Sequence, residues 1–280
     1  MANLYGIPYM GSKTGIAEDI IDILPRGERF VDLFGGGFAM THCAMLSGKW
    51  SKFLYNEINK PLVELISKAI NGDYNYERFK PEWISREKFA ELKDVDAYVK
   101  YIWSFGNKGD AYLFGEDIED FKKVIHNAVV FGDLEEACKI LPDLRNIRGK
   151  TIKERRLSCS RIIKNEIGRC DIQQLQQLQR LELVAGSYLN YIYKDGDVVY
   201  CDPPYEDTAK YTKDGFNHKE FYDWVASRPY RVYFSSYEIS DKRFYKVWDK
   251  EKRCTLSSAD NSKLNNEVLY CNQEDKISLF

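Results

Sequence analysis

This 280-residue chain lacks two features that would assign it to a secreted, metal-binding or membrane class. Its seven cysteines are scattered and form no Cys-x-x-Cys pair, so neither a disulfide framework nor a zinc site is indicated. Every apolar run is far shorter than the roughly 18 to 20 residues that span a membrane, and the N-terminal MANLYGIPYMGSK has no signal-peptide core. We therefore expect a cytoplasmic protein with reduced thiols, no membrane partner and no metal.

The chain also has no strong net charge, but one segment carries a local excess of positive charge. The formal net charge is −2, whereas residues 145–169 hold nine lysines or arginines against two glutamates. Such a segment is typical of a polyanion contact and also of a solvated helix face, and charge alone leaves both open. The candidate contacts are Arg145, Arg148, Lys150, Arg155 and Arg156.

The first 71 residues alternate between helix and strand signals. Apolar periodicity predicts a helix within 12–25 that ends at Pro25, and two strand-then-helix units follow. Successive units of this kind predict a parallel sheet covered by helices. The expected elements are strand 29–34, helix 38–48, strand 52–57 and helix 60–72.

The middle of the chain has a different texture, dense in aromatic and charged residues with helical patterns. One β-hairpin is expected within 101–115, because Asn107 to Asp110 carry turn chemistry. Strand signals return at 181–186, 196–201, 231–236 and 266–272. The expected fold is α/β, with a Rossmann-like sheet domain over 1–71 and 172–280 and a mainly helical insertion, carrying the hairpin, over 72–171.

A glycine-rich turn follows the first strand in FVDLFGGGFAM. Gly35, Gly36 and Gly37 at a strand-to-helix turn let the backbone approach a ligand, and the next helix N-terminus favours an anionic group. Glu57 lies 20 residues beyond Gly37 at the end of the next strand, where a carboxylate can bind both ribose hydroxyls. These residues indicate an adenosine-bearing ligand.

Asp32 interrupts the apolar strand before this turn. A buried carboxylate needs a cation or hydrogen-bond donors, which a ligand ammonium or the amides of the glycine loop would supply. S-adenosylmethionine carries an ammonium group, whereas a nicotinamide dinucleotide carries a pyrophosphate and would require a further glycine where Met40 stands.

The stretch VVYCDPPY places Asp202 at the end of another predicted strand. Pro203 and Pro204 fix two φ angles and remove two donors, so Asp202 and a neighbouring carbonyl form a rigid pair of acceptors beside the Tyr205 ring. A planar group with an NH2 fits this arrangement, and two acceptors on its hydrogens would make the nitrogen more nucleophilic. A strand that ends in a Pro-Pro turn with a surface tyrosine is the structural alternative.

Together these motifs resemble the amino-directed DNA methyltransferases, most closely the Dam-like DNA adenine methylases of bacteria and phages. DPPY resembles their catalytic motif, DLFGGGFA their S-adenosylmethionine motif, and PYMGSK a third element near the N-terminus. The order of the motifs around an insertion also matches. The resemblance covers most of residues 5–71 and 183–272.

The resemblance implies a role for each matching position. Asp202 and the Pro203 carbonyl would hold the target amine, with Pro204 completing the motif, and Tyr205 would stack on the extruded base. The implied cofactor contacts are Tyr9, Lys13, Asp32, Phe34, Gly35, Gly36, Gly37 and Glu57, with Asp202 beside the cofactor. The family usually has Trp at position 9 and often Asp at position 57.

Direct methyl transfer to the N6 amine of adenine in duplex DNA is the implied reaction, and it needs no covalent enzyme intermediate. Cys201 precedes Asp202 instead of following a proline, so we expect a packed strand cysteine. His42, His126 and His218 share no ligand spacing and are not needed as bases, because the product can release its proton to Asp202 or water.

DNA contacts follow from the need to flip the target base out of the duplex. Residues 145–169 would neutralise phosphates, and Lys210 with Tyr211 would close over the base or backbone. The 98–115 region partly resembles the family's recognition hairpin, where Asn107 could pair with an adenine and Lys108 with a guanine. The family's recognition arginine and Asn-x-Pro stretch are absent, so the hairpin also has a purely structural interpretation.

Other acceptors stay open at this stage. Cytosine N4, RNA adenine or a protein glutamine would keep the fold and cofactor, and a DNA-binding relative without catalysis would keep the fold; Asp202 favours adenine among them. The resemblance implies a monomer or weak dimer. A cognate restriction endonuclease would be the partner if the enzyme serves a restriction-modification pair.

Overall fold

The computed structural model describes residues 5–163, 172–176, 178–206, 215–253 and 264–274. The chain divides into two compact units. The first comprises Met1–Tyr5, Lys13–Val63 and Gln179–Phe280, and the second comprises Gly6–Ser12 and Glu64–Leu178. Each unit is described by itself below.

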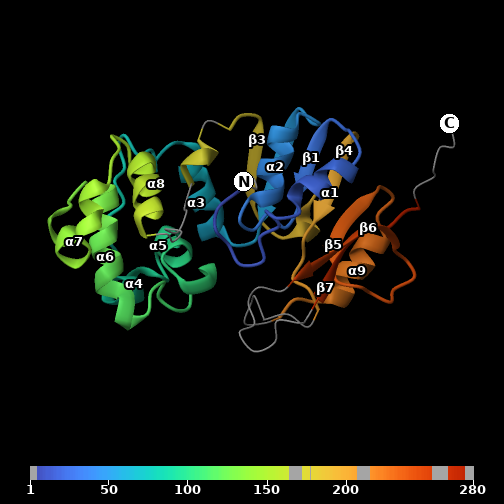
Figure 1. The fold of residues 1–280 in the computed structure, drawn as a ribbon. Helices are drawn as coiled ribbons and strands as arrows, with labels where there is room; N and C mark the ends of the chain where they lie inside the picture. Colours follow the sequence, from blue (N-terminus) through green and yellow to red (C-terminus); the bar gives the residue numbers. More distant parts are fainter. Residues whose placement is uncertain (1–4, 164–171, 177, 207–214, 254–263, 275–280) are drawn as a thin grey trace. The chain divides into compact units, whose positions relative to one another are not determined.

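The first unit is built on a seven-stranded sheet in the order β3-β2-β1-β4-β5-β7-β6 (Figure 1). The first five strands pair in parallel, and β7 is antiparallel to both β5 and β6. This mostly parallel sheet confirms the Rossmann-like α/β class. The strands are β1 Arg29–Asp32, β2 Lys52–Glu57, β3 Leu181–Ala185, β4 Asp197–Cys201, β5 Val232–Ser236, β6 Tyr245–Arg253 and β7 Leu264–Cys271.

Strand order reverses between β1 and β4, which lie side by side at the centre of the sheet. Asp32, the last residue of β1, is in register with Tyr55 of β2 and Tyr200 of β4. A crevice forms beyond the carboxyl ends of strands at such a switch point, and ligands bind there in open α/β sheets. The register therefore puts the Asp32 loop and the Asp202 loop at the same edge.

Alternating side chains on the central strands bury both faces of the sheet. Phe30, Val198 and Tyr200 join the core cluster that holds α1 and α2, whereas Val31 and Val199 join the cluster that holds α9. Strands covered on both sides read as nearly continuous apolar runs. The helices and turns of this unit are α1 Ala17–Ile23, α2 Ala39–Ser47, η4 Tyr188–Asn190 and α9 His218–Ala226, and α3 Lys60–Ile70 begins in it.

A buried ion pair fixes the amino ends of the central strands. Arg29 donates from Nε to Asp197 Oδ1 (2.8 Å) and from its terminal nitrogen to Asp197 Oδ2 (2.6 Å). The Tyr191 hydroxyl donates to the same Oδ2 at 2.6 Å. Burial opposes ionisation of Asp197, but these donors outweigh it and hold its pKa below the ordinary value.

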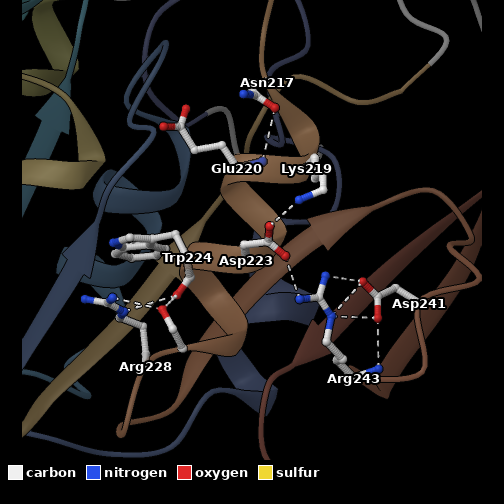
Figure 2. Close-up of polar contacts among 9 residues, drawn as sticks. Asn217, Lys219, Glu220, Asp223, Trp224, Arg228, Asp241 and Arg243 are labelled. Carbon is white, nitrogen blue, oxygen red and sulfur yellow. Dashed lines mark hydrogen bonds and ion pairs between the residues drawn. The ribbon is translucent and has the colours of Figure 1, made fainter.

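Local side-chain contacts define α9 and attach it to the β5–β6 connection (Figure 2). The Asn217 side chain accepts from Glu220 N at 3.1 Å and so caps the helix start. Asp223 pairs with Lys219 one turn earlier (2.8 Å) and with Arg243 beyond β5 (2.7 Å). These ion pairs are exposed and stabilise the fold only weakly, so the apolar face of α9 provides most of its attachment.

The second unit consists mainly of helices around two cores of its own, one centred on α6 to α8 and one on Trp103 and Tyr112. A single antiparallel bridge, Ser104 to Tyr112, stands where a two-stranded hairpin was expected. The turn was predicted correctly, since Asn107 and Gly109 both have positive φ, but Tyr101 and Ile102 belong to helix α5. The elements are α4 Arg86–Leu92, α5 Ala97–Ile102, η1 Phe105–Asn107, α6 Glu116–Val130, α7 Glu135–Ile140, η2 Pro142–Asn146, α8 Ile152–Ile163 and η3 Ile172–Leu175.

Within the described ranges, no helix is both long enough and apolar enough to cross a membrane.

Candidate active site

The glycine loop between β1 and α2 is tied to the end of β2. Gly35 N donates to Asn56 O (2.9 Å), the Tyr55 hydroxyl donates to Gly36 O (2.8 Å), and Gly36 N donates to Glu57 Oε2 (2.9 Å). Gly36 has a φ of 45°, which favours glycine. The structure therefore joins the glycine turn to Glu57, the acid that the sequence paired with it by spacing.

Gly35 has no room for a side chain. A Cβ there would lie 2.0 Å from the Tyr55 ring, which packs directly under the loop. The loop leads into α2, whose first backbone amides point back toward it as at any helix start. A backbone turn without side chains before a helix N-terminus can admit a ligand closely.

Asp32 is a buried carboxylate at this loop. Thr41 donates to its Oδ2 at 2.8 Å, while Oδ1 is buried and accepts no hydrogen bond from the residues that the structure describes. Burial raises the pKa of Asp32 to about 7, and the negative charge of Asp202 adds to that rise. A cationic ligand group would satisfy Oδ1 and stabilise the ionised form.

A second cluster of charged groups surrounds Asp202. Lys13 Nζ lies 2.8 Å from Asp202 Oδ1 and 3.3 Å from Glu267 Oε1. The Tyr205 hydroxyl donates a short hydrogen bond to Glu267, and Lys13 Nζ lies 4.6 Å from the centroid of the Tyr205 ring. One ammonium thus serves two carboxylates, and the phenol joins the second of them.

Asp202 and Glu267 differ in how far their side chains are exposed to solvent. The side chain of Asp202 is 18% exposed, whereas those of Lys13 and Glu267 are 7% and 5% exposed. Asp202 is therefore the carboxylate of this cluster that can meet a ligand from solvent.

The protonation states follow from burial and charge. Burial would lower the pKa of Lys13, but Asp202 and Glu267 raise it above its ordinary value, so the side chain is an ammonium. Burial raises the pKa of Asp202, while Lys13 pulls it down and Glu267 pushes it up. Burial and the same carboxylates keep the pKa of Tyr205 far above its usual range, so the phenol remains a donor.

Neighbouring residues fix the Asp-Pro-Pro-Tyr turn. His218, the first residue of α9, places Nε2 at hydrogen-bond distance, 2.8 Å, from the Pro204 carbonyl. The Tyr205 ring packs edge-on against Tyr237, 4.7 Å between centroids. Cys201 is fully buried in the core below the turn, as expected of a packed strand cysteine, and burial raises its pKa.

Most of the predicted site residues of the first unit come together at the carboxyl edge of the sheet. Lys13, Asp32, the loop 34–37, Glu57 and the turn 202–205 all belong to this unit. Phe34 packs its ring 5.1 Å from Tyr188 of η4. Tyr9 belongs to the second unit, where its ring lies 5.4 Å from that of Tyr101.

The other two histidines serve packing. Burial lowers the pKa of His42 to about 4, and His126 contacts the Pro81 carbonyl at 2.8 Å. In the part of the chain that the structure describes, no three His, Cys, Asp or Glu side chains are grouped so that they could hold a metal ion.

The predicted DNA contacts of the second unit divide into two groups. Arg155 donates to the carbonyls of Val129 (2.6 Å) and Val130 (2.9 Å), which end α6, and Asn107 donates to the Tyr101 carbonyl at 2.7 Å. These side chains hold their own unit together. The remaining basic side chains with described positions are Lys108, Arg145, Arg148 and Lys150, all exposed, and the half-buried Arg156.

Arg148 and Arg156 also make contacts within the second unit. Arg148 donates to the Arg145 carbonyl at 2.7 Å, and Arg156 lies 3.2 Å from the Tyr76 hydroxyl. Lys210 and Tyr211 lie outside the described residues.

Glu267 is a site residue that sequence reasoning missed, because residues 266–272 were predicted only as a strand. Its carboxylate stands in that predicted strand directly before the apolar run VLYC. The requirement for a partner that singled out Asp32 applies equally to Glu267. That signal could have found it.

Two comparisons relate the sequence to known proteins. Residues 9–141 match the family of D12 class N6 adenine-specific DNA methyltransferases. Over 284 aligned residues the chain is 24% identical to the retron Ec67 DNA adenine methylase of Escherichia coli, covering 94% of this chain and 89% of that protein.

The close contact at Gly35 gives a stability prediction. Gly35→Ala would drive a methyl group into the Tyr55 ring, so we expect the free energy of unfolding to fall by about 1–3 kcal/mol. Gly15→Ala is the matched control, because a Cβ at Gly15 meets nothing within 4 Å. Urea denaturation of both variants measures the difference, and equal stability of the two would contradict the tight approach.

Proposed function

We propose a mechanism for a chain that the family match and the retron relative identify as a Dam-like adenine-specific DNA methyltransferase of the D12 class. The enzyme methylates the exocyclic N6 amine of adenine in DNA. The observation that carries the mechanism is the cluster in which the exposed edge of Asp202 is held beside buried Lys13.

S-adenosylmethionine is the methyl donor that the site supports best. When bound, it supplies the methyl group as an electrophile on a sulfonium. Asp32 offers its buried, unfilled Oδ1 to the cofactor ammonium, and the loop from Phe34 to Gly37 would hold the methionine part. Glu57, at the end of β2, would accept the ribose hydroxyls.

Asp202 and the Pro203 carbonyl would bind the target amine as a rigid pair of acceptors. The adenine amine is a weak nucleophile because its lone pair is delocalised into the ring. Two accepted hydrogen bonds favour a tetrahedral nitrogen, and Asp202 then takes the proton that the methylated amine releases. The Tyr205 ring would stack on the base after it leaves the duplex.

Duplex DNA would contact the exposed basic residues of the second unit. Arg145, Arg148 and Lys150 would neutralise phosphates, with Arg156 beside them, and Lys108 would reach a base edge. We do not extend the proposal to Arg155, whose donors cap α6. Asn107 gives one amide hydrogen to the Tyr101 carbonyl, and its other amide hydrogen and its Oδ1 would make the proposed adenine contact.

The enzyme acts in the cytoplasm as a monomer or weak dimer, and a cognate restriction endonuclease is its partner where it serves a restriction pair. The segment 72–171 acts as the target-recognition domain inserted into the catalytic domain 1–71 and 172–280.

Product analysis tests this function. Purified protein is incubated with isotopically labelled S-adenosylmethionine and unmethylated duplex DNA, and nucleosides are identified by mass spectrometry. We expect labelled N6-methyladenine. Label in N4-methylcytosine, RNA or protein in its place would overturn the proposed acceptor.

Asp202→Asn tests the catalytic assignment, because it keeps the side-chain volume and replaces one acceptor oxygen by a donor. We expect transfer to fall by at least about 10²-fold, while cofactor affinity changes little. Single-turnover transfer and calorimetric cofactor binding measure the two quantities. Transfer at the wild-type rate would remove Asp202 from the mechanism.

The phosphate contacts predict a salt dependence. Replacing Arg145 and Lys150 together by alanine should reduce the slope of log affinity against log salt by about 2, near 0.9 per lost phosphate contact. Lys139→Ala is the control, because Lys139 is paired with Glu136 at 2.5 Å. Fluorescence anisotropy with labelled duplex measures both. An unchanged slope in the double variant would mean that Arg145 and Lys150 do not contact DNA phosphates.

A further inference from the structure

Glu267 lies inside the charged cluster although it comes from the far end of the chain. It accepts the Tyr205 phenol and shares the Lys13 ammonium with Asp202, while its own side chain is almost completely buried. Burial without partners would be costly for a carboxylate, and here two donors compensate for it.

The antiparallel direction of β7 explains how Glu267 reaches this place. Val268 is in register with Ser236, the last residue of β5, so Glu267 lies just beyond the carboxyl end of β5. Asp202 lies just beyond β4, the next strand. A parallel β7 would have carried its early residues to the opposite edge of the sheet.

We propose that Glu267 is a positioning residue for methyl transfer, which fixes the Tyr205 ring through its hydroxyl and shares Lys13 so that Asp202 faces the target amine. This inference rests on the proposed function. We place Asp202 and not Glu267 against the target amine, because the side chain of Asp202 is 18% exposed and that of Glu267 is 5% exposed.

Glu267 acts on two different neighbours, the Tyr205 ring and the Lys13 ammonium. The Tyr205 hydroxyl donates to Glu267 and the Tyr205 ring packs edge-on against Tyr237, so loss of the Glu267 contact loosens the ring. Lys13 lies between two carboxylates, so loss of the Glu267 charge leaves Asp202 as its one carboxylate partner among the described residues. The first effect concerns ring orientation and the second concerns charge.

The charge effect has a definite sign. The groups that act on Asp202 are Lys13, Glu267 and Tyr205 beside it, with Asp32, Tyr200 and Cys201 from the adjoining strands. Among them Glu267 raises the pKa of Asp202 by its negative charge. A neutral side chain at 267 should therefore move the acid limb of the rate profile, where Asp202 becomes protonated, to lower pH.

The test compares Glu267→Gln with Tyr205→Phe in single-turnover methyl transfer to duplex DNA across pH. Both should slow transfer by roughly 10- to 100-fold, because each loosens the ring that receives the base. Only Glu267→Gln should shift the acid limb. The double variant should be no slower than the slower single variant, since both substitutions act on the same hydrogen bond. Glu267→Gln weakens it by replacing the charged acceptor with a neutral amide oxygen, and Tyr205→Phe removes its donor.

Glu251→Gln is the matched control, because Glu251 is exposed on the neighbouring strand β6. It should leave both rate and pH profile unchanged. Circular dichroism and cofactor affinity establish that each variant folds. If Glu267→Gln does not fold, Glu267→Asp takes its place in the comparison. Because Glu267→Asp keeps the negative charge, we expect it to slow transfer without shifting the acid limb of the pH profile.

The outcomes separate this inference from the proposed function. A wild-type protein that makes no N6-methyladenine defeats the proposed function. A wild-type protein that makes it, with Glu267→Gln equally fast and its acid limb unmoved, defeats the role of Glu267 alone. Independent, multiplicative losses in the double variant would also overturn it.

Discussion

The buried ammonium of Lys13 is the interaction on which the catalytic edge depends. Two carboxylates, Asp202 and Glu267, lie within ion-pair distance of it, and neither has another cation so near among the described residues. Without Lys13, their mutual repulsion and burial would favour protonation of one of them. Lys13 precedes α1, whose turn begins with Ile16 N donating to the Lys13 carbonyl at 2.9 Å, so the helix start positions the cation.

Asp32 is also a buried carboxylate, but its charge is compensated differently from that of Asp202. Its neighbour Thr41 supplies one hydrogen bond, and no cation of the protein is paired with it among the described residues, which leaves its pKa near 7 and one oxygen unfilled. The two carboxylates at the switch point of the sheet therefore differ in kind. Asp202 has its counter-ion in the protein, while Asp32 would gain one from the cofactor ammonium that we propose binds there.

Prediction from the sequence was most accurate for site residues that directly follow a predicted strand. The strand ends at Glu57 and Cys201 were predicted correctly, whereas β1 ends at Asp32, two residues before the predicted end. The glycine turn was recognised from its spacing to Glu57. Parallel strands send such residues to one edge, so their proximity could be inferred without coordinates.

Prediction from the sequence was least accurate for features that depend on strand direction or on contacts between distant residues. The strand β6, YKVWDKEKR, was not predicted, because an edge strand carries charges that mask its periodicity. A carboxylate in a predicted strand could have marked Glu267 as a residue that needs a partner, but its place beside Asp202 depends on the antiparallel direction of β7, which the sequence does not reveal. The hairpin prediction was wrong for its first residues, Tyr101 and Ile102, which belong to α5, a helix whose start is capped by Asp96.

The central claim is that Lys13 holds Asp202 in a state ready to accept a proton from the target amine. Carbon-13 NMR of aspartate-labelled protein measures it most directly, with the Asp202 signal assigned from its absence in Asp202→Asn. The pKa of Asp202 should lie above the ordinary aspartate value and rise further in Lys13→Met, because the pull of the ammonium is lost. An unchanged or lower pKa in that variant would contradict the account.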